Sequence, residues 1–411
     1  MDSSSNLTSL PEESFGEEEQ LQHQSKETSS AASSAFSSIP NRPPIQASSH
    51  KYSPIGWLGY FDQEDDIHIP DSNDVFHLYK AGSGGPVVFC LHGGGYCGLS
   101  FALAASKIKE KARVVAMDLR GHGKSSTENE LDLSIETLCD DVVAVLNTMY
   151  GDTPPAIVLV GHSMGGSVAI QVAAKKALSS LSGLVVVDVV EGTAMASLIH
   201  MQKILSSRMQ YFSTIEKAIE WSVRGGSLRN IESARVSIPG TLKYDDSKKW
   251  LLYLSYTAGR NGAALERLLW MGVGKARKGG SRYEGLSEKF LSCPAPKLLL
   301  LAGTDRLDRP LTIGQMQGKF QMVVVRHTGH AIQEDVPDEF ASLILNFISR
   351  NRIGPHGIEG RTLGCCSRSQ AVEEDSYVWH RRWAAELRSK NKGEHSLHEA
   401  MMGNSDESWW W

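Results

Sequence analysis

The chain has 411 residues, 41% of them hydrophobic, and a formal net charge of -5 at pH 7. This size and balance suit one large globular domain with appended segments, and the slight acidic excess argues against nucleic acid as the main partner. No apolar run approaches the roughly 20 residues that a membrane-spanning helix needs, so we expect no membrane partner.

The first 50 residues are rich in Ser and Glu and poor in large apolar side chains, which predicts disorder. They are acidic and lack the apolar core of a secretory signal. The six cysteines of the chain show no disulfide-framework spacing, which indicates reduced thiols. We therefore expect a cytoplasmic or nuclear protein.

Residues 51–353 predict one α/β domain. It opens with alternating strands such as 75–79, and helix-like segments such as 135–149 separate the strands that follow. Those later strands are continuous apolar runs, at 87–91, 112–117, 157–160, 183–188, 297–302 and 320–325. Continuous apolar strands that alternate with helices indicate a mostly parallel sheet covered on both faces. This order is typical of the α/β-hydrolase fold.

Two segments stand apart from this alternation. About a hundred residues, 191–292, follow the sixth strand without a core strand, which predicts a cap insertion over the strand ends. Residues 354–411 predict a poorly ordered tail. The domain proper therefore ends near residue 353.

A glycine-rich loop, Leu91-His-Gly-Gly-Gly95, follows the first buried strand. Lipases and esterases use this pattern for the oxyanion hole. Glycines let backbone N–H groups approach a tetrahedral intermediate closely. We expect the donors at Gly94 and Gly95. The alternative is an ordinary flexible turn.

The strand at 157–160 runs into Gly161-His-Ser-Met-Gly-Gly166, and a small-residue helix follows. A strand, a sharp turn with Ser163 at its apex and a helix form the nucleophile elbow of a serine hydrolase. The Met164 N–H, at the helix N-terminus, is the other expected oxyanion donor. His162 is expected to pack inside or line the pocket. A glycine-rich turn of another doubly wound protein is the alternative interpretation.

A serine nucleophile needs a general base and an orienting acid. His330 lies just past the last predicted strand, where this fold carries its base, and His327 is the competing histidine. Two aspartates compete for the acid. Asp305 follows the seventh strand, and Asp188 ends an apolar run where an unpaired carboxylate is costly. The residues alone leave both open.

Several stretches match one family closely. The most specific are Val187-Asp-Val-Val-Glu-Gly-Thr-Ala-Met195 and Leu311-Thr-Ile-Gly-Gln-Met-Gln-Gly-Lys-Phe-Gln321. On these motifs the chain resembles the protein phosphatase methylesterases over residues 52–249 and 284–353. It departs from their pattern at 250–282 and after 358.

The resemblance implies a triad of Ser163, Asp188 and His330 that needs no metal or cofactor. It also implies the substrate, which is the methyl ester on the C-terminal leucine of the protein phosphatase 2A catalytic subunit. That subunit would be the partner as well. The alternatives are a hydrolase of small-molecule or lipid esters and a catalytically impaired phosphatase-binding protein.

Overall fold

The computed structural model describes residues 51–192, 194–195, 209, 211–245, 249–252, 283–303 and 307–359. Four regions for which the sequence made predictions lie outside the described residues. They are the N-terminal segment 1–50, most of the atypical stretch (253–282), the tail from 360 onward, and Asp305.

An eight-stranded sheet forms the centre of the domain, in the order β1-β2-β4-β3-β5-β6-β10-β11. Its strands are β1 (Gln63–His68), β2 (Val75–Ala81), β3 (Val87–Leu91), β4 (Arg113–Met117), β5 (Ile157–His162), β6 (Leu181–Val187), β10 (Lys297–Leu301) and β11 (Gln321–Val324). The β1–β2 and β2–β4 pairs are antiparallel, and all other pairs are parallel. This is the mostly parallel sheet that the sequence predicted.

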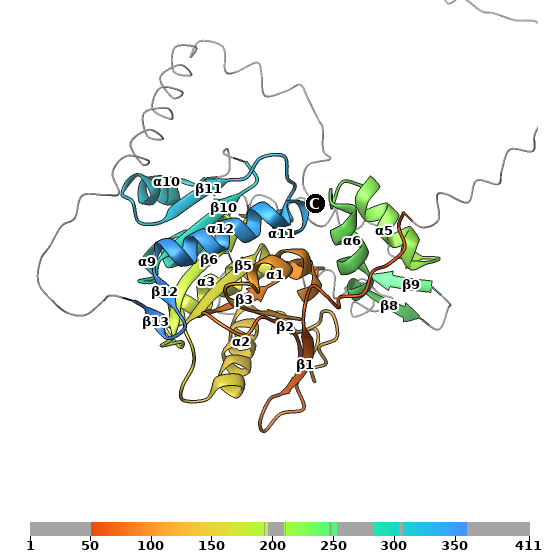
Figure 1. Cartoon of the computed structure of the whole chain (residues 1–411), viewed down its shortest axis with the longest axis horizontal. Helices are drawn as coiled ribbons and strands as arrows, with labels where there is room; N and C mark the ends of the chain where they lie inside the picture. Colours follow the sequence, from red (N-terminus) through yellow and green to blue (C-terminus); the bar gives the residue numbers. More distant parts are fainter. Residues whose placement is uncertain are drawn as a thin grey trace, which may run out of the picture. The chain divides into compact units, whose positions relative to one another are not determined.

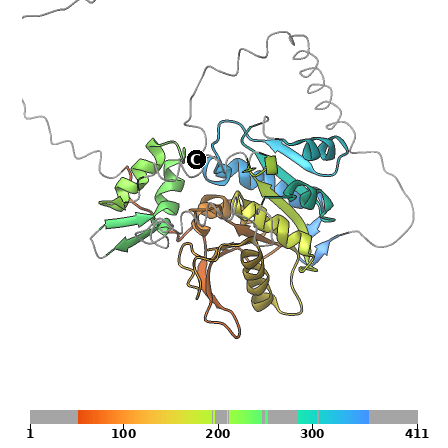
Figure 2. The same cartoon turned by 180° about the vertical axis from the view of Figure 1, so that it is seen from behind.

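Helices cover both faces of this sheet (Figures 1 and 2). On one face lie α1 (Ala102–Ile108) and α12 (Pro337–Arg350), and on the other lie α2 (Ile135–Tyr150), α3 (Met164–Lys175) and α9 (Leu286–Ser292). In β3, Phe89 joins the hydrophobic cluster of the α2–α3 face, while its neighbours Val88 and Cys90 join that of the α1–α12 face. Because alternate side chains of a strand point to opposite faces, a strand buried on both faces reads as a continuous apolar run.

A second group of elements comes from the region between β6 and β10. It contains α5 (Ile215–Arg224), α6 (Ile231–Ser237), the 3-10 turn η2 (Ile238–Thr241) and an antiparallel sheet of β7 (Tyr211–Phe212), β9 (Lys249–Leu252) and β8 (Leu242–Asp245). Side-chain oxygens cap both helices, since Thr214 accepts from Lys217 N and Asn230 accepts from Ser233 N. Within the described part of 191–292, no strand joins the main sheet.

The described chain continues a few residues past the expected domain boundary at 353. Strands β12 (Ile353–Gly354) and β13 (Gly357–Ile358) form a small hairpin, and the Ile353 side chain is buried in the α1–α12 cluster. The Ala156 N–H, next to the start of β5, donates to the Pro355 carbonyl at 3.0 Å. These contacts attach the hairpin to the sheet.

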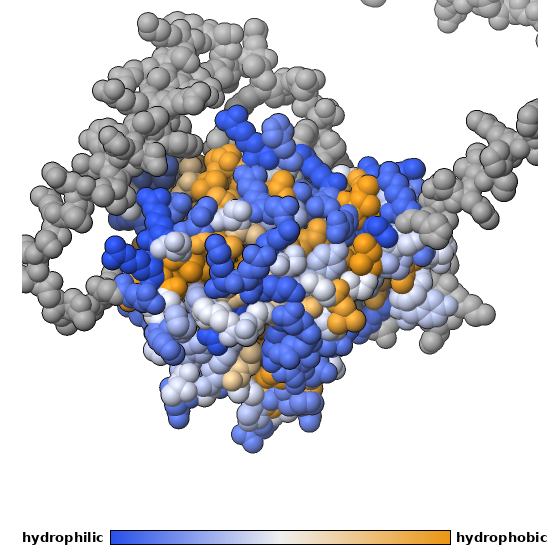
Figure 3. Space-filling model, in the orientation of Figure 1, coloured by the Kyte–Doolittle hydropathy of each residue, from blue (hydrophilic) through white to orange (hydrophobic). Residues whose placement is uncertain are grey.

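The face drawn in Figure 3 shows hydrophobic residues in small groups interrupted by hydrophilic ones. The most exposed large hydrophobic side chains of the described chain are Leu58, which precedes β1, and Met316, at the end of α10 (Arg309–Met316). Four cysteines, Cys90, Cys97, Cys139 and Cys293, are buried and not disulfide-bonded. Among the described residues, no helix combines the length and the apolar character that crossing a membrane requires.

Candidate active site

Ser163 occupies a strained turn between β5 and α3. Its backbone has φ 51° and ψ -114°, a positive-φ conformation that residues other than glycine rarely adopt. A Cβ on Gly161 would lie 2.2 Å from the Gly165 carbonyl oxygen, and one on Gly165 would lie 2.3 Å from the Leu91 carbonyl oxygen. Only glycine fits at these two positions. The glycines of the predicted elbow are therefore required by backbone contacts.

Replacing Ser163 with glycine tests whether this strain is real. Glycine adopts a positive φ without penalty, which relieves the backbone strain, but it loses more chain entropy on folding. Because the relieved strain is the larger of the two, we expect Ser163→Gly to raise the free energy of unfolding by about 1 kcal/mol. The expected rise in Tm is about 2 °C, measured by thermal unfolding. Ser179→Gly, at an exposed turn residue, is the control and should not raise Tm. A lower Tm for Ser163→Gly would contradict the strain.

Asp188 and His330 meet beside this turn. The His330 Nδ1 lies 2.7 Å from the Asp188 Oδ2, and the other carboxylate oxygen accepts the Ala302 N–H at 3.0 Å. The Asp188 side chain is fully buried, and that of His330 is 17% exposed. Asp188 follows β6 directly and Ala302 follows the adjacent parallel strand β10, so the sheet itself places this carboxylate.

The short helix α11 (Ile332–Asp335) anchors the loop that carries His330. The Asp335 Oδ2 accepts the Gly329 N–H at 2.7 Å, and its Oδ1 accepts the Arg229 N–H at 2.7 Å. Arg229 belongs to the cap, between α5 and α6. One carboxylate therefore joins the His330 loop to the cap, and no sequence motif pointed to this link.

Glu334 makes a second, buried link to the cap. Its Oε2 accepts the hydroxyls of Ser233 at 2.9 Å and Ser237 at 2.6 Å, both on α6. The side chain is completely buried, and its Oε1 has no hydrogen-bond partner in the described part of the chain. Burial raises the pKa of Glu334 from its ordinary 4.5 to about 8, although the two serine hydroxyls act in the opposite direction.

This raised pKa predicts a pH-dependent stability. The folded state holds the Glu334 proton up to about pH 8 and the unfolded state only to about 4.5, so stability should fall as pH rises between these values. Glu334→Gln should remove that part of the slope. Thermal unfolding at pH 5, 7 and 9 measures how Tm depends on pH, and Glu288→Gln, at an exposed glutamate, is the control. Parallel Tm curves for the Glu334→Gln variant and the wild type would contradict the prediction.

The glycine loop after β3 is held by two histidines. The His122 Nδ1 donates to the Arg120 carbonyl at 2.8 Å, so its Nε2 is the acceptor of the Gly95 N–H at 3.1 Å. His92 likewise donates from Nδ1 to the Gly93 carbonyl at 2.7 Å. Burial lowers the pKa of His92 well below its ordinary value, which keeps it neutral.

The three expected oxyanion donors differ in whether their N–H groups are already hydrogen-bonded. The Gly95 N–H is already donated to His122, so in this geometry it does not serve an oxyanion as expected. The Gly94 and Met164 N–H groups form no hydrogen bond within the described chain. A Cβ on Gly94 would lie 3.7 Å from the Met164 sulfur, so these two residues are neighbours.

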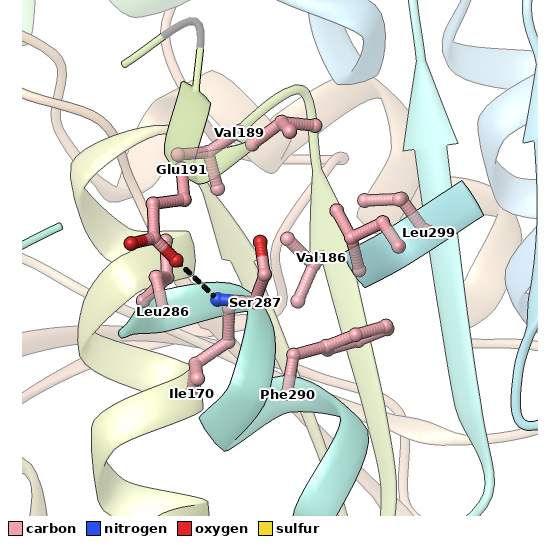
Figure 4. A pocket seen from close by; sticks show the side chains of 10 residues that line it. Ile170, Val186, Val189, Glu191, Leu286, Ser287, Phe290 and Leu299 are labelled. Carbon is pink, nitrogen blue, oxygen red and sulfur yellow. Dashed lines mark hydrogen bonds between the residues drawn. The ribbon is translucent and has the colours of Figure 1, made fainter. Parts of the chain in front are cut away.

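Glu191 fixes the point where the chain returns from the cap. Its carboxylate accepts the N–H of Gly285 at 2.8 Å. It also accepts the N–H of Ser287 at 3.0 Å, at the start of α9 (Figure 4). The pocket beside it is lined by apolar side chains that include Val189, Phe290 and Leu299. Glu191, three residues after Asp188 in the sequence, therefore anchors the start of α9. The described residues contain no group of His, Cys, Asp and Glu side chains placed to bind a metal.

Comparison with known proteins decides the family. A family model described as "Alpha/beta hydrolase family" matches residues 87–343. The protein phosphatase methylesterase 1 of Bos taurus is 42% identical over 369 residues, which cover 76% of this chain and 94% of that protein. The probable protein phosphatase methylesterase 1 of Caenorhabditis elegans is 41% identical, covering 76% of this chain and 83% of its own.

The chain belongs to the protein phosphatase methylesterase family. Membership confirms the resemblance drawn from the sequence motifs, and it makes the chain a serine ester hydrolase of α/β-hydrolase fold. Solved structures agree on the fold. An E-2-(acetamidomethylene)succinate hydrolase has a TM-score of 0.56 at 19% identity, covering 70% of this chain and 99% of its own. The thioesterase domain from the curacin biosynthetic pathway has a TM-score of 0.52 at 23% identity, covering 69% and 99%.

Proposed function

We propose that this chain removes the methyl ester from the C-terminal leucine of the protein phosphatase 2A catalytic subunit. Ser163 is the nucleophile, His330 the general base and Asp188 the acid that orients it. The observation that carries the proposal is the 2.7 Å contact between Asp188 and His330 beside the strained Ser163 turn. It occurs in a chain 42% identical to a protein phosphatase methylesterase.

The Asp188 contact sets the tautomer of His330. An ionised carboxylate only accepts hydrogen bonds, so the proton of neutral His330 resides on Nδ1 and Nε2 is left as the basic nitrogen. Nε2 takes the Ser163 hydroxyl proton as Oγ attacks the ester carbonyl carbon. A C–O bond forms, and the carbonyl π electrons move to the oxygen. Buried Asp188 stabilises the resulting imidazolium.

The oxyanion would be stabilised by the backbone N–H groups of Met164 and Gly94. Each such donor contributes about 3 kcal/mol to transition-state stabilisation. Gly95 supports this arrangement through its bond to His122, which holds the glycine loop in place. His122 therefore acts on the loop, and the Gly94 N–H is left for the oxyanion.

Collapse of the intermediate completes acylation. The bond between the carbonyl carbon and the methoxy oxygen breaks, and the imidazolium of His330 gives its proton to that oxygen. Methanol leaves, and the leucyl group remains as an ester of Ser163. Water then attacks that ester while His330 takes its proton. The bond between the acyl carbon and the Ser163 Oγ breaks, His330 returns the proton to Oγ, and the free C-terminal carboxylate leaves. Because methanol is small, selectivity must come from the acyl side, a protein C-terminus held beneath the cap.

Release of labelled methyl groups from the carboxymethylated phosphatase 2A catalytic subunit tests the proposal. We expect turnover of this protein substrate to exceed that of short p-nitrophenyl esters, compared as kcat/KM. The opposite ranking would favour a small-molecule or lipid esterase. Binding of the phosphatase without methyl release or fluorophosphonate labelling would instead identify a phosphatase-binding protein without catalysis.

A further inference from the structure

His162, which precedes Ser163, lies at the centre of the candidate site. It is fully buried, and its ring centroid is 4.7 Å from that of His330. Tyr96 packs edge-on against it, with centroids 5.1 Å apart. A Cβ added to Gly93 would lie 2.9 Å from the His162 Nδ1. One imidazole therefore touches both the general-base residue and the oxyanion loop.

The hydrogen bonds of His162 determine where its proton lies. The Nε2 is 3.0 Å from the backbone carbonyl oxygen of His330. A carbonyl only accepts, so the proton is on Nε2 and Nδ1 must be an acceptor. The partner of Nδ1 is the side-chain Nε2 of Gln333 at 3.2 Å. The two hydrogen bonds therefore point in one direction: Gln333 donates to His162, and His162 donates to the backbone carbonyl of His330.

Gln333 keeps this orientation although part of its amide is unsatisfied. The side chain is completely buried, and its Oε1 has no hydrogen-bond partner among the described residues. A buried, unpaired amide oxygen destabilises the fold. The reversed amide would place Oε1 against the Nδ1 lone pair of His162, so only the observed orientation supports the Nε2–H tautomer.

We propose that Gln333 and His162 are positioning residues for His330. Gln333 holds His162 in its neutral Nε2–H tautomer, and His162 holds the backbone of His330 in place beside the nucleophile. The inference rests on the proposed function only in taking His330 as the general base. Neither residue touches the reacting atoms in this arrangement.

Neutrality of His162 is part of this role. The titratable groups that face it are His330, Asp188, His92 and Tyr96. Burial, followed by the proximity of His330, lowers the pKa of His162 to about 3. It therefore stays uncharged at neutral pH when His330 takes a proton, and it does not repel that developing charge.

Kinetics on p-nitrophenyl acetate test the positioning role. Gln333→Met and His162→Phe keep the packing but remove a donor, so we expect kcat to fall on the order of 10- to 100-fold. KM should stay within about twofold, because ground-state binding is untouched. His162→Gln should recover part of the loss, since its amide N–H can reach the His330 carbonyl. Gln317→Met, at an exposed glutamine, is the matched control.

Nitrogen NMR of 15N-histidine-labelled wild-type protein reads the tautomer directly. We expect His162 to carry its proton on Nε2 throughout pH 5–9. A proton on Nδ1, or a titration of His162 in that range, would overturn the inference. This measurement uses the wild-type protein, so it holds even if the variants unfold. Variants with wild-type kcat would also overturn it. A wild-type protein that neither hydrolyses esters nor reacts with a fluorophosphonate would overturn the proposed function instead.

Discussion

Ser163→Ala is expected to abolish fluorophosphonate labelling and to lower kcat for ester hydrolysis on the order of 10⁴- to 10⁶-fold. The variant removes only Oγ, and alanine retains the backbone strain of this turn, so the fold should persist with an unchanged Tm. The remaining rate would come from the oxyanion donors and from substrate binding. Labelling, methyl release and thermal unfolding of one preparation measure all three quantities.

Ser179→Ala supplies the control for this variant. Ser179 is an exposed serine outside the strands and helices, and it should label and hydrolyse like the wild type. If Ser163→Ala still labels at the wild-type rate, another nucleophile carries the reaction. If it binds the methylated phosphatase but releases no methyl group, the variant becomes a means of trapping the substrate complex.

Asp188→Asn is expected to lower kcat on the order of 10⁴-fold with little change in KM. The amide NH₂ would donate to the Nδ1 of His330 and so favour the tautomer with its proton on Nε2, which cannot accept the Ser163 proton. Side-chain volume is unchanged, and the amide oxygen can still accept the Ala302 N–H. Steady-state kinetics on a short ester measure the effect.

Asp305→Asn is the informative comparison, because the sequence alone left Asp305 as an equal alternative for the acid. We expect less than a threefold change in kcat for this variant, a change too small for loss of an orienting acid. Asp152→Asn, at an exposed turn, controls for the change of charge. A large loss in Asp305→Asn together with a small one in Asp188→Asn would reverse the assignment.

The sheet and the elbow were predictable because their causes are local. Strand β3 reads as apolar throughout because both its faces are buried, and Gly161 and Gly165 are required by contacts within a few residues or across one loop. The residues alone left Asp188 and Asp305 open as the acid, although a carboxylate at the end of an apolar run needs a partner. The structure supplies that partner in His330.

The contacts around His330 could not be predicted in the same way. Gln333 and His162 are 171 residues apart, and Glu334 and Ser233 are 101 apart, so no local pattern connects them. Helix α11 has only four residues, too few for a periodic signal. The acidic pair at 334–335 resembles the acidic residues in the first turn of α12. Its hydrogen bonds to the cap depend on how elements distant in the sequence pack.

The cap insertion lies in the sequence between the residues of the proposed triad. Ser163 and Asp188 precede it and His330 follows it, while the returning chain is anchored independently by the bonds of Glu191 to the start of α9. A break in the polypeptide between residues 252 and 283 would place the proposed nucleophile and the proposed base on two fragments. Neither fragment alone contains the three groups, so ester hydrolysis by a mixture of the two would report their reassembly.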